Sequence, residues 1–84
     1  MHYSGILVVV RTGTVGESTQ RLESLSGVEV HYAYPAQDRL IVVQETESVE
    51  GQQSGLRKIQ SLPDVVMAEL VYHQVDDSET QTAG

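Results

Sequence analysis

Hydrophobic residues recur along the chain in two different spacings. Segments of mostly β-branched residues, and segments in which every second residue is apolar, predict strands. Segments with apolar residues at helical spacing predict helices. The predicted strands are 5–11, 28–34, 39–45 and 64–74, and the predicted helices are 15–25 and 47–61. Gly27 stops the first helix and Pro63 the second, since glycine is free to take positive φ and the residue before proline avoids the α region.

Each predicted helix has a candidate start. Thr14 and Glu17 fit a capping box, in which the Thr14 hydroxyl accepts from the Glu17 amide. At the second helix the hydroxyl of Thr46 is the predicted cap, with acidic residues following at the positive end of the helix dipole. Gly51 and Gly55 each disfavour this helix by about 1 kcal/mol relative to alanine, so we expect it to depend on packing against the sheet.

The order βαββαβ predicts a ferredoxin-like α+β fold. Its four-stranded antiparallel sheet has the spatial order 4-1-3-2, and both helices lie on one face. We expect residues 1–75 to form this single domain. Residues 76–84 are rich in acidic and small polar residues, and we expect them to form a disordered acidic tail.

The sheet face without helices is the most informative feature for function. The first, third and fourth predicted strands are apolar on both sides, so apolar side chains stay outside whichever side the helices cover. Soluble monomers rarely expose a large apolar patch without a partner. This face therefore predicts binding of a peptide or of a second copy of the chain, which leaves a monomer or a weak homodimer open.

The last predicted strand supplies the candidate binding residues. Strict period two places Met67, Glu69, Val71 and His73 on one side of this strand. Glu69 is the one charged residue within the apolar run. It is either a solvated charge that protects an edge strand or an anionic contact inside an apolar binding surface.

The second predicted strand also alternates with period two. The same rule predicts its two sides: Val28, Val30, Tyr32 and Tyr34 on one, and Glu29, His31 and Ala33 on the other. Glu29 is a second and weaker anionic candidate, because its strand is expected at the opposite edge of the sheet.

Composition narrows the possible partners. The chain has 84 residues, 5 basic and 12 acidic, with a formal net charge of −7, which argues against nucleic acid and anionic membrane surfaces as partners. Cysteine is absent, which excludes disulfides and thiolate metal sites and favours a reducing cytoplasm. The apolar run 6–10 is far too short to cross a membrane.

Nothing in the motifs predicts catalysis. The GxxG pattern at 13–16 is better explained as a turn and helix start than as an RNA clamp. His2, His31 and His73 lack metal-ligand spacing, and no activated serine or phosphate-binding loop is present. We therefore expect no enzymatic activity, no metal and no cofactor.

The last predicted strand also carries a family resemblance. The run Leu-Pro-Asp-Val-Val-Met-Ala-Glu-Leu-Val-Tyr-His-Gln at 62–74, followed by an acidic segment, resembles the NapD family. Weaker similarity is found in Ser-Gly-Val-Glu-Val at 26–30, Arg-Leu-Ile-Val-Val at 39–43, and Met1-His2 before an apolar strand. The resemblance extends over residues 2–76.

The resemblance implies a ferredoxin-like fold and a cytoplasmic chaperone without enzymatic activity. Such proteins bind the twin-arginine signal peptide of NapA, the catalytic subunit of the periplasmic nitrate reductase, and delay its export until the molybdenum cofactor is inserted. An acidic protein with an uncovered apolar sheet complements a peptide with a basic start and an apolar stretch. The peptide could bind as a helix on the sheet or as an added strand. The alternative is a βαββαβ small-molecule-sensing or dimerising regulatory domain.

Overall fold

A computed structural model describes residues 1–75 and contains each predicted strand and helix. The elements are β1 (His2–Val10), α1 (Val15–Glu23), β2 (Val28–Tyr34), the 3-10 turn η1 (Pro35–Gln37), β3 (Arg39–Thr46), α2 (Val49–Gln60) and β4 (Val65–Val75). The predicted acidic tail, 76–84, lies outside the described residues.

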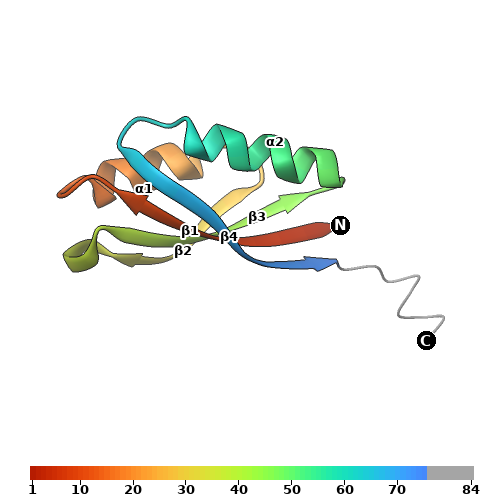
Figure 1. The fold of residues 1–84 in the computed structure, drawn as a ribbon, viewed down its shortest axis with the longest axis horizontal. Coiled ribbons are helices and arrows are strands. Elements are labelled where there is room, and N and C mark those ends of the chain that lie inside the picture. The colour runs from red at the N-terminus through yellow and green to blue at the C-terminus, as the bar shows by residue number, and fades with distance from the viewer. Residues whose placement is uncertain (76–84) are drawn as a thin grey trace.

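The strands form one antiparallel sheet in the order β2-β3-β1-β4. Both helices lie on the same face of this sheet, and no described element covers the opposite face (Figure 1). The ferredoxin-like prediction, including its strand order, is therefore confirmed. We call the uncovered side the open face.

The hydrophobic core lies between the sheet and the helices. Alternate residues of β1, such as Ile6 and Val8, are fully buried against Leu22 of α1 and Ile59 of α2. Burying a side chain of this size stabilises the fold by about 1.5–3 kcal/mol. Because strand side chains alternate, Leu7 and its equivalents on the other strands point toward the open face.

The two helix starts differ from those predicted. Thr14 has φ −110° and ψ 12°, which is not the extended geometry of a capping residue, and its hydroxyl donates to the Arg11 carbonyl at 2.7 Å. The capping-box prediction is therefore wrong. At α2 the cap is Ser48, whose hydroxyl accepts from the Gly51 amide at 3.0 Å. Thr46, the predicted cap, ends β3 instead.

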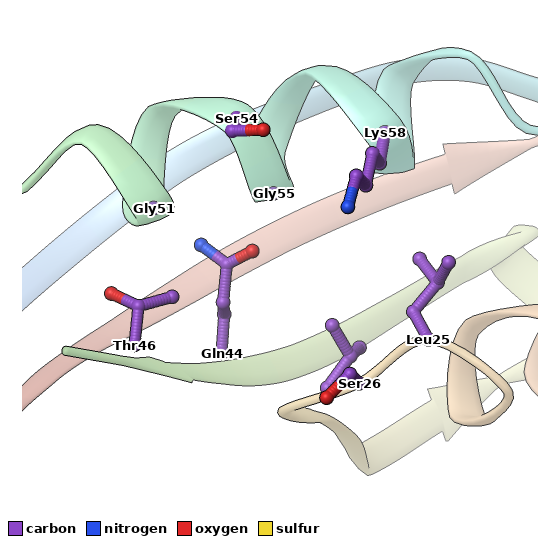
Figure 2. Close-up of a pocket in the computed structure, with 9 residues that line it drawn as sticks. Leu25, Ser26, Gln44, Thr46, Gly51, Ser54, Gly55 and Lys58 are labelled. Carbon is purple, nitrogen blue, oxygen red and sulfur yellow. The ribbon is translucent and has the colours of Figure 1, made fainter. Parts of the chain in front are cut away.

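The glycines of α2 make room for a buried amide. Figure 2 shows the Gln44 side chain of β3 pointing toward Gly51 and Gly55 of α2. Gln44 is 2% exposed, and its Nε2 donates to the Gln52 carbonyl at 3.1 Å. A Cβ at Gly55 would overlap the Gln44 amide. The glycine that weakens the helix locally is therefore what lets it lie close to the sheet.

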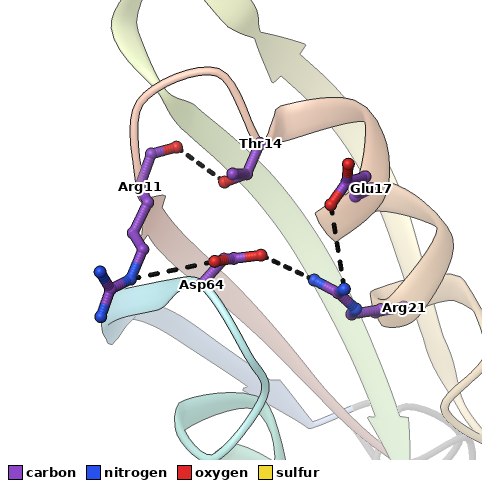
Figure 3. A network of polar contacts seen from close by, with 5 residues as sticks. All are labelled: Arg11, Thr14, Glu17, Arg21 and Asp64. Carbon is purple, nitrogen blue, oxygen red and sulfur yellow. Dashed lines mark hydrogen bonds and ion pairs between the residues drawn. The ribbon is translucent and has the colours of Figure 1, made fainter.

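A polar network joins α1 to the start of β4. Asp64 has φ +69° and accepts a hydrogen bond from Arg21 Nη1 at 2.9 Å (Figure 3). Its other carboxylate oxygen lies 3.9 Å from Arg11 Nε, and Arg21 also lies 3.9 Å from Glu17. Asp64 therefore links two segments of the chain that are distant in sequence, and it does so at the end of the sheet where α1 begins.

We expect Asp64→Asn to lower the free energy of unfolding by about 1 kcal/mol, because it weakens a charge-assisted hydrogen bond in a partly exposed network. Asparagine tolerates the positive φ, so the backbone is undisturbed. Urea denaturation measures the change. Glu17→Gln is the control: its carboxylate is 70% exposed, and we expect a change below about 0.5 kcal/mol. Equal losses in the two variants would contradict this assignment.

Candidate functional site

The open face is the candidate functional site. Its centre consists of half-buried or exposed apolar side chains from β1, β3 and β4: Leu7, Val9, Ile41, Val43 and Met67. Leu7 is in register with both Ile41 and Glu69, so the three strands contribute to one continuous surface. Contiguous apolar patches on a soluble protein are typical of interaction sites.

The predicted residues of β4 do not all lie on this face. Met67 is opposite Val9 and Glu69 is opposite Leu7, so both point toward the open face as predicted. A β-bulge follows: Leu70 pairs with Ile6 and Tyr72 with Gly5, which leaves Val71 as an extra residue without a partner in β1.

The bulge reverses the sides of the residues beyond it. His73 is opposite Ser4, a buried residue on the helix side, so the prediction that His73 shares a side with Glu69 is wrong. Tyr72 takes the position on the open face instead. A Cβ at Gly5 would overlap the Tyr72 ring, so the ring lies directly against the glycine backbone. A glycine inside a strand was the one sequence signal for this bulge.

A bulge in β2 reorients its tyrosines. The register between β2 and β3 shifts at His31, so Tyr32 is opposite Ile41 and Tyr34 is opposite Arg39. Both tyrosines therefore extend the open face, rather than sharing the side of Val28 as predicted. Their rings lie 6.4 Å apart with an interplanar angle of 22°.

One end of the open face is a hollow of about 410 Å³ with two carboxylates at its lining. Glu29 on β2 and Glu45 on β3 contribute these groups, around Val43 and Tyr3. Glu29 lies 3.8 Å from His31, an ion pair when the imidazole is protonated. No arginine or lysine lines the hollow. Glu45 was missed by the sequence analysis because no motif marks it; only the antiparallel register brings it close to Glu29.

Neither a group of metal ligands nor a membrane-spanning helix is found in residues 1–75. His2 and His73 converge, with Nδ1 and Nε2 3.1 Å apart and rings stacked at 5.3 Å. Among the described residues, no group of three potential ligands could hold a metal ion. None of the described helices has the length and apolar character needed to span a bilayer.

Comparisons with known proteins identify the family of this chain and solved structures with the same fold. The family model described as NapD protein matches residues 1–77. The solution structure of the E. coli Tat proofreading chaperone protein NapD is similar with a TM-score of 0.80 and 24% identity, covering 89% of this chain and 79% of that one. The crystal structure of hypothetical protein PHS023 from Pyrococcus horikoshii has a TM-score of 0.77 and 25% identity, covering 92% and 93%. No curated protein matches significantly. Because the family model spans nearly the whole chain, this chain belongs to the NapD family.

Proposed function

We propose that this protein is a cytoplasmic chaperone without enzymatic activity that binds the twin-arginine signal peptide of the nitrate reductase catalytic subunit NapA. By occupying the peptide it delays export until the cofactor is inserted and the subunit has folded. One observation carries the proposal: the open face joins an apolar centre to an acidic hollow. Family membership and the similarity to a Tat proofreading chaperone support it.

The apolar centre matches the apolar stretch of such a peptide. Met67, Tyr32 and Tyr72 are each more than 40% exposed, so a peptide that covers them removes apolar surface from water at about 25 cal/mol per Å². Bulges interrupt the hydrogen-bonding rows of both edge strands, β2 and β4, which disfavours an added strand. We therefore place the peptide across the open face, with its own backbone bonded internally as a helix.

The acidic hollow gives the bound peptide a direction. Arginine side chains form bidentate hydrogen bonds with carboxylates, and Glu29 and Glu45 are the carboxylates beside the apolar centre at this end. The arginine pair then lies over the hollow, and the apolar stretch runs over Leu7 toward Met67. Glu69, on the far edge strand, borders the apolar stretch rather than the arginine pair.

The direct test is calorimetric titration with the synthetic twin-arginine signal peptide of the cognate nitrate reductase. We expect saturable binding at a ratio of one to one, weakened when both arginines are replaced by glutamine. Analytical ultracentrifugation of the protein alone is the companion measurement. A stable dimer that does not bind the peptide would assign the open face to a second copy of the chain and overturn the proposal.

We expect the double variant Glu29→Gln/Glu45→Gln to lower peptide affinity about fivefold at low salt, since exposed ion pairs contribute about 0–1 kcal/mol each. The loss falls mainly on the association rate and shrinks at 1 M salt, where the Debye length is about 3 Å. Stopped-flow fluorescence of a labelled peptide measures it. Glu17→Gln/Glu50→Gln, on the two helices, removes the same charge elsewhere. If this control slows association as much, net charge alone explains the effect.

A further inference from the structure

One basic residue of this acidic chain lies on the open face. Of the five lysines and arginines, Arg39 is the only one within a strand. It begins β3, where it is exposed and lies on the same side as Ile41 and Val43. Asp38, the residue before it, accepts a hydrogen bond from the Gly13 amide at 3.1 Å, and no described carboxylate forms an ion pair with Arg39. Its guanidinium is therefore available to a partner molecule.

Arg39 and the acidic hollow lie at opposite ends of the open face. Arg39 is opposite Tyr34 of β2 and Val9 of β1, and Met67 of β4 completes this row across the sheet. Glu45, at the hollow, lies near the other end of β3. At about 3.4 Å per residue, the two positions are about 20 Å apart along the strand. The face therefore runs from carboxylates at one end to a guanidinium at the other.

We propose that the open face is polarised for one α-helix of the peptide, with the helix N-terminus at the acidic hollow and the C-terminus at Arg39. A helix carries partial positive charge at its N-terminus and partial negative charge at its C-terminus, so both ends of the face match it. The N–H groups of Arg39 donate to the last carbonyls, which have no partner within the helix. This inference rests on the proposed function, which supplies the helical peptide. The helix then runs antiparallel to β3.

The separation of the two ends also selects the length of the helix. At 1.5 Å per residue, a span of about 20 Å corresponds to about 13 helical residues. A shorter helix places its unpaired carbonyls over Leu7 and Ile41, whose side chains have no hydrogen to donate. A longer helix presents Arg39 with carbonyls that are already hydrogen-bonded within the helix. Arg39 is thus a specificity-determining residue for where the helix ends.

A charge swap in the peptide tests the contact at Arg39. Two twin-arginine peptides carry either glutamate or lysine about 13 positions after the arginine pair. We expect Arg39→Gln to lower the ratio of glutamate-peptide to lysine-peptide affinity about fivefold relative to the wild type at low salt. Arg57→Gln, which removes the same charge from an exposed position on α2, should leave this ratio unchanged. A ratio that Arg39→Gln does not change, or that Arg57→Gln lowers as much, would overturn the inference.

The same swap placed about six positions after the arginine pair tests the length. At that position the peptide residue lies near the middle of the face, so the affinity ratio should no longer depend on Arg39. Equal dependence on Arg39 at both positions would mean that the face does not select where the helix ends.

Spin labels on the peptide report the direction of the helix. A label at its C-terminal end is expected to broaden the methyl signals of Val9 and Met67, and a label beside the arginine pair those of Val43. Broadening in the reverse order overturns this inference and leaves peptide binding itself intact. A protein that binds none of these peptides overturns the proposed function as well.

Discussion

Met67→Asp is expected to lower the affinity for the twin-arginine signal peptide by about 30-fold, because binding buries a carboxylate that has no partner and removes a thioether contact. Met67 is 43% exposed and lies on the open face, opposite Val9. The added negative charge attracts a cationic peptide. If electrostatics alone governed recognition, Met67→Asp would bind the peptide more tightly than the wild type. A loss of affinity therefore shows that burial of the apolar surface outweighs this attraction. Isothermal titration calorimetry at moderate salt gives the dissociation constants.

Val49→Asp is the matched control for this experiment. Val49 is an apolar residue with similar exposure, 51%, but it begins α2 on the helix side of the sheet. An acidic residue in the first turn of a helix is favourable, so this variant should fold and bind the peptide as wild type does. Tighter binding by Met67→Asp would mean that charge dominates recognition and that the apolar stretch lies elsewhere.

Gly55→Ala is expected to lower the free energy of unfolding by about 2 kcal/mol, although alanine is the better helix former by about 1 kcal/mol. The new methyl group occupies the space of the Gln44 amide. Gln44 must then move, and its 3.1 Å hydrogen bond to the Gln52 carbonyl is lost in a buried site. Urea denaturation followed by circular dichroism measures the change.

Two further variants separate packing from helix propensity. Gly16→Ala changes a glycine of α1 with open space around its Cβ position, and should raise stability by about 0.5–1 kcal/mol. In a Gln44→Ala background the obstacle is gone, so Gly55→Ala should become stabilising as well. If Gly55→Ala destabilises the protein equally in both backgrounds, the Gln44 amide is not the reason for the glycine.

The fold followed from local patterns, but the composition of the open face did not. Met67 and Glu69 were assigned to the correct side because they precede the β4 bulge at Val71. His73 was assigned to the wrong side because it follows this bulge, and for the same reason Tyr72 was not recognised as a residue of the open face. The bulge places the Tyr72 ring against Gly5, a contact between residues on two strands. Period-two reasoning carries no information about such contacts.

The start of α2 also shows that a local sequence rule does not include contacts between strands. Ser48 and Thr46 are both hydroxyl residues near the start of α2, and either satisfies the sequence rule for a cap. β3 extends through Thr46, because its pairing with His2 of β1 continues to that residue. The pairing of β3 with β1 therefore determines that Ser48, and not Thr46, caps α2.

The sequence by itself determined the order of strands and helices, the strand order of the sheet, and the presence of an apolar face on an acidic protein. These properties depend on hydrophobic periods and charge counts, which survive small irregularities. Only the tertiary structure decided that Tyr32 and Tyr72 join that face and that Glu45 lies beside Glu29. The reason is geometric: one extra residue in a strand reverses every side chain beyond it, and register alone makes neighbours of distant residues.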